Sequence, residues 1–162
     1  ALGGRGRGAT FTLGLRSANA LPAAPAPAAQ RATTALGGLR ILLVEDDEAM
    51  SEALAALLEH LGATVATAAS VRTALGLLPD AAPDILLSDI GMPGESGYAL
   101  IREIRAREAT GTTRLPALAM TGFASPEDRD EARAAGFDDH VPKPVDPDTL
   151  VRRIRDLTGG TH

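Results

Sequence analysis

Residues 85–93 contain a short apolar run that ends in a carboxylate, Asp89, followed by a turn. An apolar run of this length, bounded by turn residues, is typical of a buried strand in a parallel sheet. Asp89 would then lie at the carboxyl end of its strand, the edge where open α/β sheets bind ligands. The segment therefore predicts a parallel sheet that presents an acid at its binding edge.

Three further apolar runs are followed closely by polar side chains. In chain order, these side chains are Glu45, Asp46, Thr121 and Lys143. If all four runs are strands of one parallel sheet, then three acids, a hydroxyl and an ammonium group meet at one edge. We therefore treat these residues and Asp89 as one candidate site.

Helical patterns alternate with the apolar runs along the chain. We predict strands at 40–44, 64–69, 85–88, 115–120 and 137–141, and helices at 48–61, 70–78, 97–108, 125–135 and 146–157. Pro79 is expected to follow the end of the second helix. The pattern is five βα units with short connections.

Few topologies accommodate five βα units with right-handed crossovers. The favoured one is a flavodoxin-like, doubly wound α/β fold, a five-stranded parallel sheet of strand order 2-1-3-4-5. The first and third strands are then neighbours, which places Glu45 and Asp46 beside Asp89. Asp47, one residue later, is expected to begin the helix.

Composition narrows the class of protein. Hydrophobic residues make up 44% of the chain but aromatic residues only 2%, so the core must be aliphatic. Without cysteine, neither a disulfide framework nor a thiolate metal site can form. The sequence has no apolar stretch long enough to span a membrane and no signal peptide pattern, so we expect a cytoplasmic location.

Charge is distributed unevenly along the chain. All 21 acids lie at or after Glu45, whereas residues 1–38 carry four arginines and no acid. An acidic body of this kind argues against nucleic-acid binding. Of the 16 basic residues, 15 are arginine and one is Lys143, which suggests a position that needs a compact ammonium group.

The clustered carboxylates of the candidate site would repel one another, and a divalent cation resolves that repulsion. Mg²⁺ takes oxygen ligands, so Asp46 and Asp89 could bind it directly and Glu45 through water. Asp89 would then be a nucleophile toward phosphorus, forming an aspartyl phosphate. Lys143 would neutralise phosphoryl oxygens, and Thr121 could donate a hydrogen bond to the product.

Four motifs in this order and spacing resemble the receiver domain of two-component response regulators. They are Val-Glu-Asp-Asp, Ser-Asp-Ile-Gly-Met-Pro, Met-Thr-Gly and Val-Pro-Lys-Pro. The resemblance implies that Asp89 accepts a phosphoryl group from a phosphohistidine domain of a histidine kinase. It also implies that Glu45 and Asp46 form the acidic pair for Mg²⁺.

The resemblance assigns further roles by position. The Gly91 carbonyl is expected to face Mg²⁺, Thr121 is the switch hydroxyl, and His140 stands at the switch-aromatic position. The peptide bond before Pro144 resembles one that is cis in this family. Such a domain catalyses only its own phosphorylation and dephosphorylation.

The chain before the domain divides by composition. Residues 1–16 resemble the last glycine box and final strand of the ATP-binding domain of sensor histidine kinases, and 17–38 read as an Ala/Pro-rich linker. Residues 39–158 form the receiver and 159–162 a tail. We expect the C-terminal receiver of a hybrid sensor histidine kinase, with a histidine phosphotransfer protein as a possible further partner; the alternative is a stand-alone response regulator.

Two other classes of function fit the sequence less well. A phosphatase with an aspartyl-phosphate intermediate would carry a second Asp two residues after the nucleophile, where this chain has Gly91. A flavin-binding domain would need a phosphate loop after the first strand, where Glu45, Asp46 and Asp47 would repel phosphate. Gly91 and Phe123 also offer no polar side chain to orient water, which predicts a long-lived phosphoaspartate.

Overall fold

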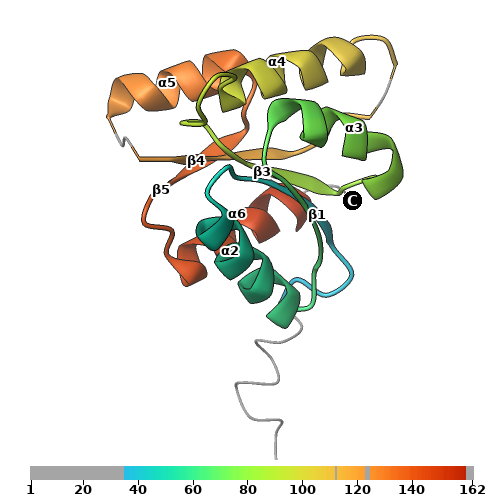
Figure 1. The fold of residues 1–162 in the computed structure, drawn as a ribbon, viewed down its shortest axis with the longest axis vertical. Helices are drawn as coiled ribbons and strands as arrows, with labels where there is room; N and C mark the ends of the chain where they lie inside the picture. Colours follow the sequence, from blue (N-terminus) through green and yellow to red (C-terminus); the bar gives the residue numbers. More distant parts are fainter. Residues whose placement is uncertain (1–34, 112, 123–124, 160–162) are drawn as a thin grey trace, which may run out of the picture.

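The computed structural model of the chain describes residues 35–111, 113–122 and 125–159 (Figure 1). The predictions for residues 1–16, for most of the linker and for Phe123 lie outside the described residues.

The described residues form a five-stranded parallel sheet with the order β2-β1-β3-β4-β5, which confirms the predicted flavodoxin-like fold. The strands are β1 (Arg40–Val44), β2 (Thr64–Ala68), β3 (Ile85–Asp89), β4 (Ala117–Thr121) and β5 (Asp139–Pro142). The helices are α2 (Glu48–His60), α3 (Val71–Ala81), α4 (Gly97–Glu108), α5 (Pro126–Ala135) and α6 (Pro147–Gly159).

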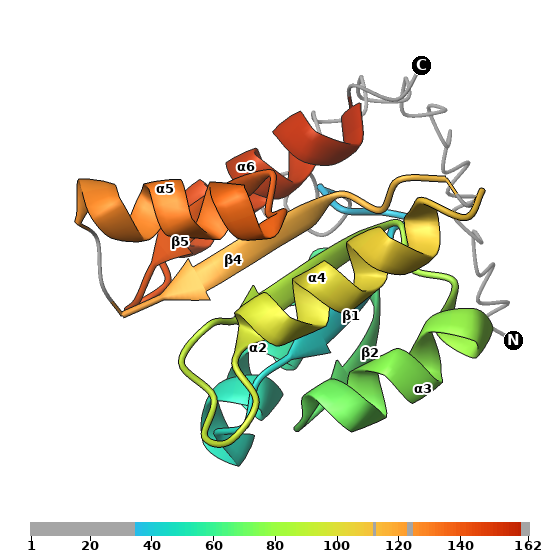
Figure 2. The same ribbon diagram turned by 90° about the horizontal axis from the view of Figure 1, so that it is seen from above.

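Helices cover both faces of the sheet. Helices α3, α4 and α5 lie on one face, and α2 and α6 on the other (Figures 1 and 2). Side chains alternate along each strand, so Leu42 and Leu86 face the first layer while Ile41 and Leu87 face the second. Residues of β3 and β4 are buried throughout, which explains why these strands read as continuous apolar runs.

Two helices begin with side-chain caps that the sequence indicates. The Asp47 carboxylate accepts a hydrogen bond from the Met50 N–H at 2.9 Å, so Asp47 begins α2 as predicted. Ser125 and Asp128 form a reciprocal capping box at the start of α5, with Pro126 at the first helical position. These caps fix where the chain turns after β1 and before α5.

The second helix ends later than the sequence analysis predicts. Pro79 lies inside α3, which continues to Ala81 and ends at Ala82 with a left-handed φ of 38°. A proline lacks the N–H that would bond to the preceding turn, and its ring crowds the carbonyl four residues earlier, but near a helix end only the last turn is affected, and the two following residues still adopt helical geometry. The expectation that Pro79 follows the helix end is therefore wrong.

Strand β4 begins two residues later than predicted because side chains form hydrogen bonds with the backbone of Leu115. The Glu108 carboxylate accepts from the Leu115 N–H at 2.7 Å, and Arg105 donates to the Leu115 carbonyl at 2.8 Å. Arg105 also donates to the Gly136 carbonyl and pairs with Asp138 at 3.1 Å. This half-buried network ties α4 to the approaches of β4 and β5 at the amino edge of the sheet.

Residues 35–38 pack on the domain although the sequence analysis assigns them to the linker. Leu36 is only 1% exposed, and its N–H donates to the Leu61 carbonyl at 2.9 Å. Gly38 takes a φ of 82° and donates to the Gly62 carbonyl. The chain therefore meets the domain at the turn between α2 and β2, before Leu39.

Candidate functional site

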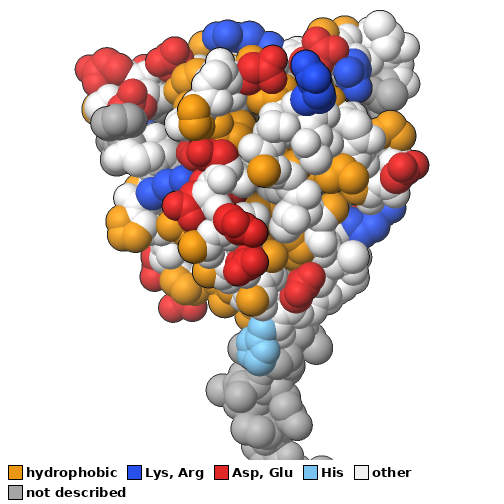
Figure 3. Space-filling view, in the orientation of Figure 1, with side chains coloured by type: hydrophobic (Ala, Val, Ile, Leu, Met, Phe, Trp, Pro, Cys, Tyr) orange, Lys and Arg blue, Asp and Glu red, His pale blue; other side chains and the backbone are white. Residues whose placement is uncertain are grey.

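Three carboxylates meet at the carboxyl edge of the sheet. Glu45 and Asp46 follow β1, and Asp89 is the last residue of β3; their oxygens lie within 4.8 Å of one another. The strand register causes this, because Val44 pairs with Ser88 and the next residues leave the sheet side by side. Glu45 and Asp89 are buried, whereas Asp46 is exposed. Figure 3 shows acidic side chains gathered around the start of α2.

Lys143 reaches this cluster from the loop after β5. Its Nζ lies 2.8 Å from Glu45 Oε2 and 3.1 Å from Asp89 Oδ2. The Lys143 N–H donates to the Thr121 carbonyl at 2.7 Å, and the peptide bond to Pro144 is cis, as the family resemblance implies. The structure thus brings together the residues that the sequence analysis groups as one site.

The electrostatics of the cluster favour a cation. Burial lowers the pKa of the Lys143 ammonium, but its hydrogen bonds to Glu45 and Asp89 and their negative charges outweigh burial, so the pKa is raised overall. Lys143 therefore stays protonated and compensates one of the three carboxylates. The remaining negative charge and the all-oxygen donor set fit Mg²⁺.

The three carboxylates differ in the hydrogen bonds that they already accept from the protein. Glu45 accepts from Lys143 through Oε2 and from the Asp47 N–H through Oε1 at 3.3 Å. Asp89 accepts from Lys143 and from the Gly91 N–H at 3.0 Å. The exposed Asp46 is therefore the carboxylate best placed to bind a metal directly, and an indirect role suits Glu45.

Gly91 lies directly beside the Asp89 carboxylate. A Cβ atom added at this exposed glycine would lie 3.7 Å from Asp89 Oδ1, an ordinary contact distance. Any side chain at this position would therefore lie beside the route by which water reaches the Asp89 carboxylate. The predicted role of the Gly91 carbonyl toward Mg²⁺ stays a prediction.

The two predicted switch residues occupy neighbouring strands. Thr121 ends β4 and is 7% exposed, and half-buried His140 lies on β5. Burial is the main reason that the pKa of His140 is lowered, and nearby guanidinium groups lower it further while Asp139 opposes them. These guanidinium groups belong to Arg129, Arg133 and Arg153. The switching role of both residues stays a prediction.

Gly97 is a structural requirement that the sequence analysis does not identify. It is the first residue of α4, and an added Cβ would collide with the Asp89 carbonyl oxygen and lie 3.0 Å from Ile90 Cα. Only glycine lets α4 start this close to the backbone that carries Asp89. The available signal was a glycine at the first position of a helix, where glycine is otherwise a poor choice.

The family of the chain follows from comparison with known proteins. The model of the response regulator receiver domain matches residues 41–155, so the chain belongs to the receiver domain family. In two-component signalling, this family takes phosphate from histidine kinases. The site described above therefore lies in a domain of a signal-transduction family.

Relatives include both short proteins and large ones. The chain is 41% identical over 120 residues to an uncharacterized 14.6 kDa protein from Leptolyngbya boryana, covering 74% of this chain and 90% of that protein. It is 37% identical over 161 residues to the virulence sensor protein BvgS of Bordetella bronchiseptica, covering 93% of this chain and 13% of that protein. The chain thus spans only a small part of some of its relatives.

A solved structure has the same fold. The signal receiver domain of a signal transduction histidine kinase from Syntrophus aciditrophicus superposes with a TM-score of 0.67 at 30% identity, covering 76% of this chain and 92% of that chain. Among the described residues, no helix has the length and apolar character needed to cross a membrane.

Gly97→Ala should destabilise the domain by about 1–3 kcal/mol, the usual cost of overpacking, because the methyl group would collide with the Asp89 carbonyl. Gly76→Ala in α3 is the matched control, since a Cβ there meets nothing within 4 Å. That control should be neutral or stabilise by up to about 1 kcal/mol. Urea unfolding of both variants measures this, and equal stabilities would contradict the close approach.

Proposed function

We propose that this chain accepts a phosphoryl group from a phosphohistidine donor onto Asp89 with the help of Mg²⁺. The observation that carries the proposal is the position of the Asp89 carboxylate, 3.1 Å from Lys143 Nζ and inside a cluster of three acids. Membership of the receiver family supplies the reaction type.

The proposed step is a displacement at phosphorus. An Asp89 carboxylate oxygen forms a bond to phosphorus, and the bond between phosphorus and the donor imidazole nitrogen breaks with its electron pair going to that nitrogen. When bound, Mg²⁺ would neutralise charge on the phosphoryl oxygens. Lys143 contributes a fixed positive charge toward an oxygen of the transferred group. Asp46 and Asp89, with Glu45 behind them, are the residues that would hold the metal.

The phosphorylated state would be read through the strands next to the site. We infer that the Thr121 hydroxyl donates to the new phosphate, and that His140 moves into the space left behind it. The surface that changes is then formed by α5, β5 and α6. The position of the two residues on adjacent strands supports this route, since Thr121 ends β4 and His140 lies on β5, two register positions before the partner of Thr121.

The similarity to BvgS supports a place for this domain in a larger sensor kinase. Residues from Ile41 to the end make up about three quarters of the chain, so a match that covers 93% must extend into the residues before Ile41, which we call the leader. A leader shared with a sensor protein favours the C-terminal receiver of a hybrid sensor histidine kinase, with a histidine phosphotransfer protein as a further partner. The Leptolyngbya boryana relative, of which the match covers 90%, favours the alternative of a stand-alone regulator.

Replacing Asp89 tests the proposed site. Asp89→Asn keeps the side-chain shape but removes the nucleophile, so a small acyl phosphate and Mg²⁺ should no longer phosphorylate the protein. Asp80→Asn, on exposed α3 surface, is the control and should be labelled like the wild type. Mass spectrometry of the intact and digested protein reads the result. Phosphate on Asp46 or Asp47 in the Asp89→Asn variant would contradict the assignment.

The sequence that precedes Ala1 in the intact protein tests the hybrid-kinase proposal. We expect the residues immediately upstream to contain the remaining glycine boxes and the Asn-bearing helix of a kinase ATP-binding domain. Sequencing the coding region upstream of Ala1 is sufficient. An upstream region without these motifs would favour the stand-alone alternative and leave the phosphorylation proposal untouched.

The phosphorylated state should be long-lived, with loss of phosphate over minutes or longer. Gly91 offers no polar group to orient an attacking water, so Gly91→Asn should accelerate loss by up to about 10²-fold. Gly94→Asn is the control, because position 94 lies in the same loop, an added Cβ there meets nothing within 4 Å, and Asn is among the non-glycine residues that best tolerate its φ of 86°. The decay of intact phosphoprotein in Mg²⁺ measures the rates. Loss within seconds from the wild type, unchanged in Gly91→Asn, would refute the water-access argument.

A further inference from the structure

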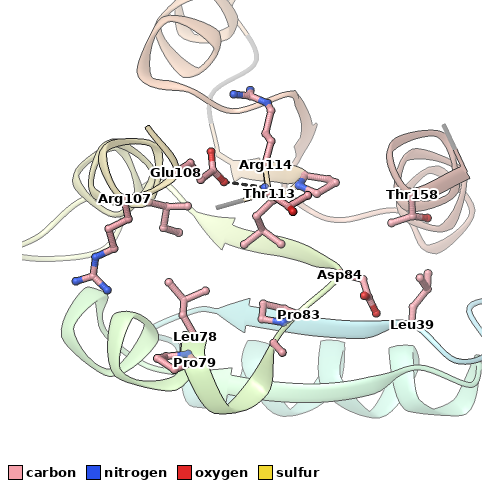
Figure 4. A pocket seen from close by; sticks show the side chains of 14 residues that line it. Leu39, Leu78, Pro79, Pro83, Asp84, Arg107, Glu108, Thr113, Arg114 and Thr158 are labelled. Atoms are coloured by element: carbon pink, nitrogen blue, oxygen red, sulfur yellow. Dashed lines mark hydrogen bonds between the residues drawn. The ribbon is translucent and has the colours of Figure 1, made fainter. Parts of the chain in front are cut away.

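A cavity of about 770 Å³ lies at the amino edge of the sheet, opposite the edge that carries Asp89 (Figure 4). It opens between the carboxyl ends of α3 and α4 and the segments that enter β1, β3 and β4. Its large apolar contributors are Leu39, Leu78, Pro79, Ile104 and Leu115. The cavity therefore offers an apolar surface that the phosphorylation site does not use.

The charged side chains around this cavity already have partners. Asp84 pairs with Arg40 at 3.0 Å and Glu108 with Arg105 at 2.7 Å. Arg114 pairs with Asp138 and Arg107 with Glu103. Because each charge is compensated, the cavity has no feature that selects a charged ligand, and a neutral apolar occupant suits it best.

The chain itself contains such an occupant close by. Residues 20–29 read Ala-Leu-Pro-Ala-Ala-Pro-Ala-Pro-Ala-Ala and carry no charge. Leu21 is the one large apolar side chain in this segment. A sequence of alternating Ala and Pro favours an extended conformation, so little conformational entropy is lost when it binds.

The attachment point of the leader brings this segment within reach. The described chain begins at Ala35, and Leu39, four residues later, already lines the cavity. Ala29 precedes Ala35 by six residues, which span at most about 20 Å when extended. A short tether gives an effective concentration of about a millimolar, so weak apolar contacts are enough.

We propose that the cavity at the amino edge binds the chain's own segment 20–29, with Leu21 as its apolar anchor. Docking would hold the domain in a fixed orientation relative to the part of the chain before residue 20. The occupied cavity would also touch Ile104 on α4, the helix whose first residue, Gly97, packs against the backbone of Asp89. The proposal does not depend on phosphorylation of Asp89.

A spin label on the leader tests the proposal in the full chain. Since the chain has no cysteine, Ala24→Cys accepts a single nitroxide label. NMR methyl signals of Ile104 and Leu115 should then be broadened more strongly than those of Leu61. Leu61 lies nearer the tether, because its carbonyl accepts from the Leu36 N–H. A leader that moves freely would broaden Leu61 at least as strongly, and that result would overturn the proposal.

Matched variants separate docking from chance contact. Leu21→Asp leaves every described residue of the domain unchanged, and it should restore the Ile104 and Leu115 signals. Thr113→Trp, which fills the cavity from its exposed rim, should do the same. A label at Ala9→Cys should leave the cavity signals largely intact. A Leu21→Asp variant with unchanged broadening would refute the anchor.

Mixing isotope-labelled protein with spin-labelled protein tests whether the contact is within one chain. Broadening in this mixture would mean that the segment binds a second copy, which contradicts the intramolecular proposal. Sharp signals in the mixture, together with broadening in the doubly labelled chain, support it.

Discussion

The repulsion between Glu45, Asp46 and Asp89 is the constraint around which the functional edge of this domain is built. The parallel register of β1 and β3 forces these carboxylates together, because Val44 and Ser88 are paired immediately before them. Lys143 compensates part of that charge through contacts of 2.8 and 3.1 Å. One ammonium group cannot neutralise three carboxylates, so the net charge of the cluster remains negative, which suits a divalent cation.

The opposite edge of the sheet has the reverse character, since its charges are paired within the domain. Arg105 pairs with Glu108 and Asp138, and Arg40 donates to Asp84. These contacts fix the starts of the strands, while the ends of β1 and β3 lead into the acidic cluster. Helix α4 connects the two edges, since Gly97 packs against the Asp89 backbone and Arg105 anchors the far end. A displacement of the loop that carries Asp89 would therefore act on a rigid element anchored at its other end.

The sequence was sufficient to predict the sheet order and the proximity of Lys143 to Glu45 and Asp89, because an apolar run that ends in a polar residue indicates both a strand and the sheet edge at which that residue lies. The ends of elements were harder to predict. The start of β4 depends on Arg105 and Glu108, whose side chains bind the carbonyl and the N–H of Leu115. Both residues belong to the preceding helix, so the sequence around Leu115 does not indicate this contact. The burial of Leu36 depends on contact with Leu61, which no local pattern reveals. The need for glycine at position 97 likewise arises from a tertiary contact, because a Cβ at this position would collide with the Asp89 carbonyl oxygen.

His140 is a titratable residue at the position where the resemblance to receiver domains predicts the switch aromatic. Burial and then the guanidinium groups of Arg129, Arg153 and Arg133 lower its pKa, and the Asp139 carboxylate only partly opposes them. A His whose ordinary pKa is about 6.5 and whose folded pKa is lower is neutral at pH 7. In that state the imidazole is a compact, uncharged ring that can enter a partly buried space without the cost of burying a charge. Burial, and then the arginines around His140, therefore favour the neutral ring that the proposed switching role requires.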